Sequence, residues 1–156
     1  MPGSGKSYIG KRLAEHLGHV FVEIDTMIEK IENKSLEEIV TRYGVDNFLD
    51  LESRVLINQT SDIQHAIISP GGSVVYREAS MSHLKNISKI VYLKVSFECV
   101  IERIGTKPRG IVYKDNQTIA DLYSERIELY KTYADYIVDG SQTAEKVISQ
   151  IIYAIH

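Results

Sequence analysis

The sequence predicts an α/β domain in which a parallel sheet lies between two layers of helices. Short apolar runs alternate with segments of helical periodicity along the chain, which is typical of such sheets. The chain also opens with MPGSGKS, which matches the P-loop pattern G-x-x-x-x-G-K-[ST] at every position after its first glycine. With 156 residues, we expect one domain over 1–156.

The elements expected in the first half follow from apolar spacing and from residues that begin or end helices. Apolar residues recur at helical intervals after the opening loop, and a glycine then stops the pattern. A capping box at Ser35 predicts the start of another helix. The expected elements are a helix from Ser7 to Gly18, a strand at 20–24, a short helix from Ser35 to near Gly44, a longer helix with Phe48, Leu51 and Val55 on one stripe, and a strand at 66–69.

In the second half, strands and helices alternate around one basic segment. RIGTKPRGIVYK, at 103–114, has four basic residues, two glycines and a proline, so we expect a mobile cationic loop there. The expected elements are a strand at 89–95, a helix from about Ser96, helices at about 118–133 and 143–155, and a strand at 136–139.

Composition narrows the class of partner. The net charge of -3 does not favour binding to a polyanion such as nucleic acid. The single cysteine, Cys99, permits no internal disulfide. No run approaches the roughly 18 apolar residues of a membrane span. No signal peptide precedes the loop. We therefore expect a cytoplasmic monomer that binds a small molecule, and neither nucleic acid nor membrane.

The opening loop predicts phosphate binding. Gly3 and Gly5 allow the backbone around Ser4 to approach phosphate oxygens, the charge of Lys6 reaches the β and γ phosphates, and the hydroxyl of Ser7 binds Mg²⁺. A chance glycine-rich turn is the alternative. The strongly periodic helix directly after Gly-Lys-Ser favours the P-loop.

The first expected strand ends in two carboxylates. Glu23 and Asp25 alternate with Ile24, so both are expected on one side at the carboxyl edge of the sheet, where ligands of α/β proteins bind. One could hold Mg²⁺ through water, and the other could orient or deprotonate an attacking hydroxyl. A solvated strand end is the alternative.

Three further features point to a small anionic ligand. Gly71 and Gly72 follow a strand and could contact a ligand through the backbone, unless they form a plain tight turn. Arg126 lies on the apolar stripe of its helix and needs an internal acid or a ligand anion. Lys107 and Arg109 could close over the transferred phosphate, or form a solvated basic loop.

The order of these motifs resembles the shikimate kinase family over nearly the whole chain. The motifs are the P-loop, the paired acids, NFLDLE, SPGGSVV, TKPRG and ERIELY. The resemblance implies a P-loop kinase fold with five parallel strands and the P-loop strand at the centre. It also implies transfer of the γ-phosphate of MgATP to the 3-hydroxyl of shikimate.

The resemblance also implies residue roles, a helical substrate-binding region at about 25–61 and a lid at about 103–117. ATP would contact Gly3, Ser4, Gly5, Lys6, Ser7, Arg103 and Lys107; Mg²⁺ would contact Ser7 and Glu23; shikimate would contact Asp25, Gly71, Gly72 and Arg126, with Lys6, Asp25 and Lys107 as the catalytic set.

The chain departs from the family pattern at three positions. Glu23 and Ser73 replace the family's aspartate and third glycine, and Leu49 stands where F-R-x-x-E has a second carboxylate-binding arginine. A kinase for another hydroxy acid or sugar, such as gluconate, is therefore the second interpretation, and a catalytically degenerate nucleotide-binding protein is the third.

The strand that delivers the chain into a P-loop is expected before Met1. Without it, two neighbouring strands would keep unpaired backbone groups in the interior. We hypothesise that the true start lies upstream and that Met1 is internal. A partner chain or another segment filling the gap is the alternative.

Overall fold

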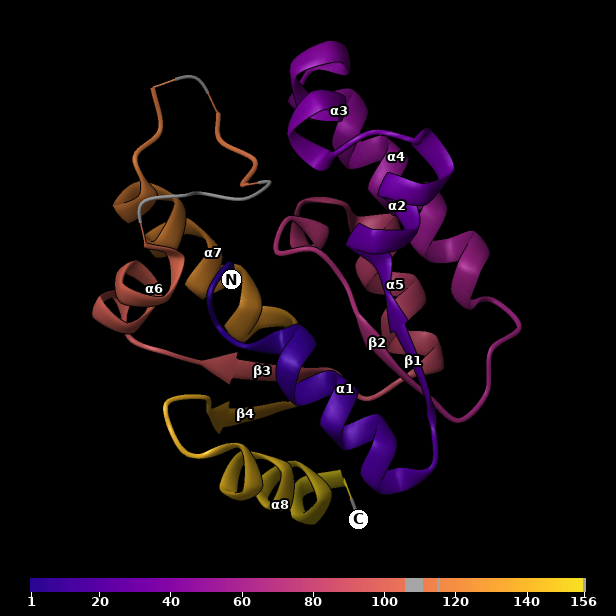
Figure 1. The fold of residues 1–156 in the computed structure, drawn as a ribbon, viewed down its shortest axis with the longest axis vertical. Helices are drawn as coiled ribbons and strands as arrows, with labels where there is room; N and C mark the ends of the chain where they lie inside the picture. The colour runs from indigo at the N-terminus through magenta and orange to yellow at the C-terminus, as the bar shows by residue number, and fades with distance from the viewer. Residues whose placement is uncertain (106–110, 115, 156) are drawn as a thin grey trace.

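A computed structural model of the protein describes residues 1–105, 111–114 and 116–155 (Figure 1). Helices and strands alternate through these residues. They are α1 (Lys6–Leu17), β1 (Val20–Glu23), α2 (Ile24–Glu32), α3 (Leu36–Tyr43), α4 (Val45–Thr60), β2 (Ala66–Ser69), the short 3-10 helix η1 (Val74–Tyr76), α5 (Glu78–Ile87), β3 (Val91–Lys94), α6 (Phe97–Ile104), α7 (Ile119–Tyr133), β4 (Tyr136–Asp139) and α8 (Ala144–Ile155).

The strands form two parallel pairs. β1 pairs with β2 in a register that places Val20 opposite Ala66, and β3 pairs with β4 in a register that places Val91 opposite Tyr136. The two pairs lie on opposite sides of α1 in Figure 1. Among the described residues, β2 and β3 are not hydrogen-bonded to each other.

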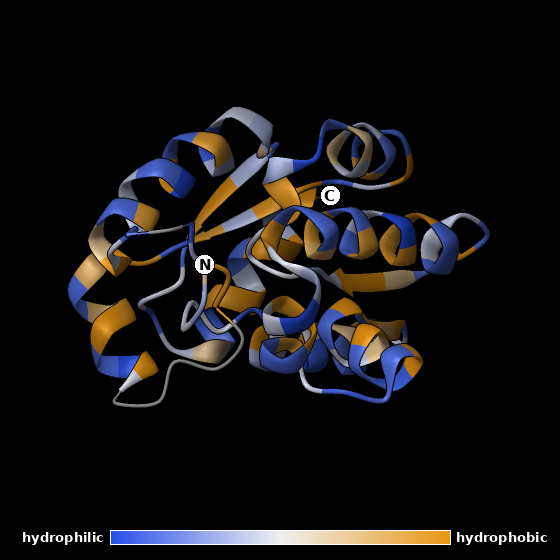
Figure 2. Ribbon diagram, turned by 90° about the horizontal axis from the view of Figure 1, so that it is seen from above, coloured by the Kyte–Doolittle hydropathy of each residue, from blue (hydrophilic) through white to orange (hydrophobic). Residues whose placement is uncertain are grey.

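Buried side chains form one cluster on each face of the strands. Neighbouring residues of β3 show the alternation, because Tyr92 belongs to the larger cluster and Leu93 to the smaller one. The smaller cluster joins α1 and α8 to β3 and β4, whereas the larger one contains residues of α2 to α5 and α7. Figure 2 shows the strands as mostly hydrophobic and the helices as mixed. The predicted α/β fold with helices on both faces is confirmed.

The predicted elements occur close to their expected bounds, and their ends have the expected caps. Ser35 forms a capping box with Glu38, and the Ser96 hydroxyl accepts a hydrogen bond from the backbone N–H of Cys99. Helix α5 was not predicted, because within Glu78–Ile87 only Met81 and Leu84 are buried apolar residues at helical spacing. Within the described residues, no helix combines the length and the apolar composition that a membrane span requires.

Candidate active site

The phosphate loop has the backbone shape that its glycines allow. Gly3 and Gly5 have φ values of 71° and 90°, in the left-handed region that favours glycine, and the Ser4 N–H donates to the Met1 carbonyl at 3.2 Å. Helix α1 begins at Lys6, and its N-cap residue, Gly5, supplies no side-chain cap. The first-turn N–H groups of α1 are therefore available to an anion.

Helix α6 holds the outer side of this loop. A Cβ atom at Gly3 would lie 3.3 Å from both Ile104 Cγ1 and the Val100 carbonyl oxygen, so the loop packs closely on this helix. The Arg103 guanidinium donates to the carbonyl oxygens of Gly3, Ser4 and Gly140 at 3.3–3.5 Å. The predicted nucleotide contact Arg103 thus lies against the phosphate loop.

Lys6 is half-buried beneath the loop. Desolvation lowers the pKa of its ammonium group, the Asp25 charge opposes that shift, and the positive charge of Arg126 adds to it. Two further carboxylates, Glu52 and Glu23, also stabilise the protonated amine. Lys6 is therefore a cation with little water around it, next to acids from two other segments.

The structure brings Glu23 and Asp25 together in a different way from the predicted strand alternation. The strand ends at Glu23, which is the N-cap of α2, and Asp25 lies in the first turn of that helix. The prediction of two acids on one strand is wrong because Ile24 and Ile28, both fully buried, continue a helical pattern. Both carboxylates nevertheless act on the charge of Lys6.

Asp25 meets a second buried carboxylate across Gly71. A Cβ atom at Gly71 would collide with Glu52 Oε1 and would lie 2.7 Å from Asp25 Oδ1, so a larger residue here would displace both carboxylates. Burial raises the pKa of Asp25, and the charge of Lys6 opposes that increase. The backbone after β2 thus lies between two acids, one on α2 and one on α4.

Glu52 is 1% exposed and only partly paired. The Ser73 hydroxyl donates to Oε2 at 2.7 Å, while Oε1 has no hydrogen-bond partner among the described residues. Burial raises the pKa of Glu52 to about 7; the charge of Asp25 adds to the increase, and the Ser73 hydrogen bond, Arg126 and Lys6 oppose it. The Glu52 carboxyl group therefore changes its protonation state near neutral pH, although it is buried.

We expect Glu52→Gln to weaken the pH dependence of stability. Because the pKa of Glu52 is raised from 4.5 to about 7 in the folded protein, the folded protein keeps the Glu52 proton to a higher pH than the unfolded chain does. The contribution of Glu52 is thus most favourable below pH 4.5 and is lost as pH rises through 7, by roughly 3 kcal/mol. Denaturant unfolding at pH 5 and pH 8 measures this loss, which the glutamine should remove. Glu37→Gln, at an exposed position of α3, is the control; equal slopes in all three proteins would contradict the expectation.

Arg126 is 1% exposed and faces the other glycine. Its Nη2 donates to the Val112 carbonyl at 3.1 Å and its Nε to the Tyr76 hydroxyl at 3.3 Å. A Cβ atom at Gly72 would lie 2.9 Å from Nη1, so this edge of the guanidinium faces the loop after β2. Among the described residues no carboxylate lies within 4 Å of the guanidinium, which favours the ligand anion over the internal acid.

Tyr130 supports the same loop. Its hydroxyl donates to the Gly72 carbonyl at 2.7 Å, and burial raises the pKa of this phenol. The sequence did not single out Tyr130 or Glu52 as site residues. Each lies on the buried stripe of its helix, Glu52 one turn after Phe48 and Tyr130 one turn after Arg126. A polar side chain on an apolar stripe needs a partner, and this feature of the sequence could have identified both as site residues.

The predicted residues thus converge at the carboxyl ends of β1 and β2. The structure brings together five of them, which are Lys6, Asp25, Gly71, Gly72 and Arg126. Lys107 and Arg109, predicted to close over the phosphate, lie outside the described residues.

The oxygen atoms near the loop suit Mg²⁺ bound together with phosphates. Ser7 is exposed in the first turn of α1, and a carboxylate oxygen of Glu23 accepts from the Thr26 hydroxyl at 3.0 Å. In the part of the chain that the structure describes, no three His, Cys, Asp or Glu side chains form a metal cage. Mg²⁺ at phosphoryl-transfer sites commonly uses one or two protein oxygens and takes the rest from phosphates and water.

Comparison with known proteins finds relatives that match nearly the whole chain. A family model described as shikimate kinase matches residues 2–156. A shikimate kinase of Clostridium botulinum (strain Okra) is 37% identical over 152 residues, covering 95% of this chain and 88% of the relative. A shikimate kinase of Dictyoglomus turgidum is 32% identical, covering 98% and 90%.

Solved structures give the same result. The structure of shikimate kinase from Acinetobacter baumannii in complex with shikimate superposes with a TM-score of 0.89 at 28% identity, covering 99% of this chain and 88% of that one. The shikimate kinase of Aquifex aeolicus superposes with a TM-score of 0.83 at 29% identity, covering 97% and 90%.

Proposed function

Because this chain belongs to the shikimate kinase family, whose members are phosphotransferases with an alcohol group as acceptor, we propose that it transfers the γ-phosphate of MgATP to the 3-hydroxyl of shikimate. One observation carries the proposal. The Asp25 carboxylate lies beside Gly71 and the Arg126 guanidinium, which has no carboxylate partner among the described residues, lies beside Gly72. The charges of both side chains act on Lys6. An acceptor that bears both a carboxylate and a hydroxyl fits this arrangement.

On the nucleotide side, we propose that the loop from Gly3 to Lys6 holds the phosphates. The free N–H groups at the start of α1 and the Lys6 ammonium suit the β and γ phosphates. Ser7 and, through water, Glu23 would hold Mg²⁺, which when bound neutralises phosphate charge. Arg103 and Lys107 complete the proposed nucleotide contacts.

On the acceptor side, we propose that Arg126 binds the carboxylate and Asp25 the attacking hydroxyl. The hydroxyl proton passes to the Asp25 carboxylate as the hydroxyl oxygen bonds to the γ-phosphorus. The bond between the γ-phosphorus and the oxygen that bridges it to the β-phosphate breaks, and ADP is released with that oxygen. The raised pKa of Asp25 brings it closer to that of a general base at neutral pH. Gly71 and Gly72 allow the acceptor to reach the backbone.

The test is ATP turnover with shikimate and with a panel of other hydroxy acids and sugars, gluconate included. The proposal requires shikimate to have the highest kcat/KM. A higher value for another acceptor would support the second interpretation, which the replacement of the family's arginine by Leu49 favours. Nucleotide binding without turnover of any acceptor would indicate a degenerate nucleotide-binding protein.

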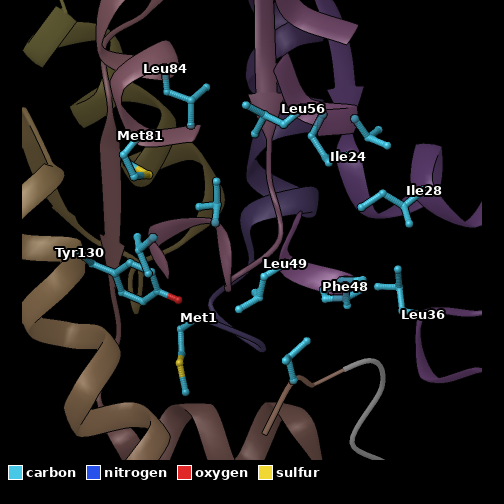
Figure 3. Packing of buried hydrophobic residues seen from close by; sticks show 14 of the residues in the cluster. Met1, Ile24, Ile28, Leu36, Phe48, Leu49, Leu56, Met81, Leu84 and Tyr130 are labelled. Atoms are coloured by element: carbon cyan, nitrogen blue, oxygen red, sulfur yellow. The ribbon is translucent and has the colours of Figure 1, made fainter. Parts of the chain in front are cut away.

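Leu49 stands where the family pattern has a second arginine for the acceptor carboxylate. It is 5% exposed and belongs to the same buried cluster as Met1, Phe48 and Tyr130 (Figure 3). Arg126 is therefore proposed to bind the acceptor carboxylate without the second guanidinium of the family pattern. A charge-assisted pair contributes roughly 1.5 to 3 kcal/mol, so shikimate should bind about tenfold or more weakly than with both arginines.

We expect Leu49→Arg to lower the KM for shikimate by about tenfold, at saturating MgATP. The new guanidinium would start one helical turn before Glu52, whose unpaired Oε1 is a ready partner for it. The melting temperature should therefore stay close to that of the parent. Leu49→Met, which keeps the side chain apolar and similar in volume, is the matched control for repacking. No kinetic gain together with a lower melting temperature would indicate an acceptor of different geometry.

A further inference from the structure

The loop after β2 contacts the Arg126 guanidinium at two places. Gly72 lies beside Nη1, because a Cβ atom there would be 2.9 Å from that nitrogen. Further along the same loop, the Tyr76 hydroxyl accepts a hydrogen bond from Nε at 3.3 Å, and the guanidinium carbon lies 5.3 Å from the centre of the Tyr76 ring. One loop therefore contacts both the Nη1 end and the Nε end of the guanidinium.

Buried neighbours fix the position of Tyr76. Tyr76 ends η1, and its N–H donates to the Ser73 carbonyl at 2.9 Å. Val74 and Val75, the other residues of this turn, are buried in the larger cluster, and the Tyr76 side chain packs against the same cluster. A closely packed turn leaves the ring little freedom, so the hydroxyl presents a fixed acceptor to Arg126.

The segment 111–114 contacts the same guanidinium and the same ring. Arg126 Nη2 donates to the Val112 carbonyl at 3.1 Å. The Lys114 ammonium lies 5.2 Å from the centre of the Tyr76 ring. Cations are attracted to the face of an aromatic ring, so Tyr76 is a common contact for one cation from α7 and one from this segment.

Glu125 fastens this segment to α7. Lys114 Nζ donates to its Oε1 and Gln117 Nε2 to its Oε2, both at 2.7 Å. The hydrogen bond from Lys114 is the largest cause that lowers the pKa of Glu125, and the Tyr76 hydroxyl contributes to the same shift. The Lys114 side chain is 59% exposed, so the ion pair by itself adds little stability. Its effect is to restrict where the Val112 carbonyl can lie.

The bonds to Tyr76 and Val112 orient Arg126 without neutralising it. Both partners are uncharged oxygens, and a buried guanidinium keeps its charge. These bonds use Nε and Nη2, whereas Nη1 lies beside Gly72, next to the proposed acceptor. The orientation therefore leaves Nη1 free to donate a charge-assisted hydrogen bond toward the acceptor.

This orientation is more important because Leu49 supplies no second guanidinium. Two arginines would hold a carboxylate from two directions, and a small rotation of one of them would have a limited effect. With Arg126 alone, the direction of one guanidinium determines where the acceptor carboxylate binds.

We propose that Tyr76 is a positioning residue, which orients Arg126 toward the acceptor carboxylate. The Lys114–Glu125 pair supports this orientation by holding the Val112 carbonyl. The inference rests on the proposed function, which assigns the acceptor carboxylate to Arg126. Because the proposed phosphate transfer does not involve Tyr76, its contribution lies in acceptor binding. The expected signature is a change in the KM for the acceptor at constant kcat.

The test is Tyr76→Phe, which keeps the ring and removes the hydroxyl. We expect the KM for shikimate to rise about tenfold, as for the loss of a hydrogen bond to a charged group, while kcat and the KM for ATP stay within about twofold. Tyr133→Phe, which removes a hydroxyl at the end of α7, is the control and should leave all three constants unchanged. Lys114→Met, which removes the exposed ion pair, should raise the KM for shikimate only about two- to threefold.

A second measurement separates the carboxylate from the rest of the acceptor. The carboxamide of shikimate is similar in shape but uncharged, so calorimetry should show that the parent binds it more weakly than shikimate. Tyr76→Phe should reduce this preference for the carboxylate by about tenfold. A general defect in folding would weaken the binding of both ligands equally and leave the preference unchanged.

Three results would overturn the proposal. If the parent prefers the carboxylate and Tyr76→Phe keeps the full preference, Tyr76 has only a structural role, while the proposed function stands. If the parent does not distinguish the two ligands, Arg126 does not bind the carboxylate, and the proposed acceptor site fails together with the inference. A larger effect of Lys114→Met than of Tyr76→Phe on the KM for shikimate would make Lys114 itself the cation that binds the carboxylate.

Discussion

Lys6→Met should reduce kcat/KM for phosphoryl transfer by about a thousandfold or more with every acceptor. The ammonium group lies at the start of α1, among the charges of Asp25, Glu52 and Glu23. Methionine keeps the apolar part of the side chain but cannot neutralise charge on the transferred phosphate. The measurement is steady-state ATP turnover with shikimate.

The fold should tolerate this change. Desolvation is the largest effect on the Lys6 charge and outweighs the attraction of Asp25, and an uncharged methionine side chain relieves it, so the melting temperature should not fall by more than a few degrees. Lys11→Met, on an exposed position of the same helix, is the control and should leave both turnover and melting unchanged. If Lys6→Met turned over ATP at the parent rate, the proposed kinase mechanism would fail.

Asp25→Asn should reduce kcat by about 10²- to 10⁴-fold while the affinity for ATP stays within a fewfold of the parent value. Asparagine can accept a hydrogen bond from the acceptor hydroxyl but cannot take its proton at neutral pH. The separation of kcat from ATP affinity is diagnostic, because a role in holding Mg²⁺ would change both.

The measurement is turnover at saturating shikimate, together with nucleotide binding by calorimetry. Asp62→Asn, at an exposed loop position, controls for the loss of one negative charge. An equal loss of ATP binding and turnover in Asp25→Asn would assign Asp25 to the metal or to the structure instead.

The sequence predicted those parts of the site that depend on local pattern. The turn made by the P-loop glycines, the start of α1, expected at Ser7 and found at Lys6, and the inward position of Arg126 all follow from spacing within one segment. Cap residues such as Ser35 fixed helix starts for the same reason. The sequence pattern of one helix is sufficient to predict a feature that depends only on interactions within that helix.

The convergence of Glu52, Asp25 and Gly71 could not be predicted in this way. These residues come from α4, α2 and the turn after β2, and their contact depends on how those segments pack. The start of α2 was misread for a related reason, since Ile24 suits a buried strand as well as a buried helix. Tertiary packing decided between them.

Each strand pair is closed within its own half of the chain, which has a consequence for the order of folding. The partners Val20 and Ala66 are 46 positions apart, and Val91 and Tyr136 are 45 apart. The entropy lost on closing two such similar loops is nearly equal, so neither pair has an advantage and each can form without the other. Helix α1 packs on β2 and on α8, and the larger buried cluster, which contains residues of α2 to α5 and α7, also spans the two halves. The cooperativity of unfolding should therefore depend on α1 and on this cluster more than on either pair of strands.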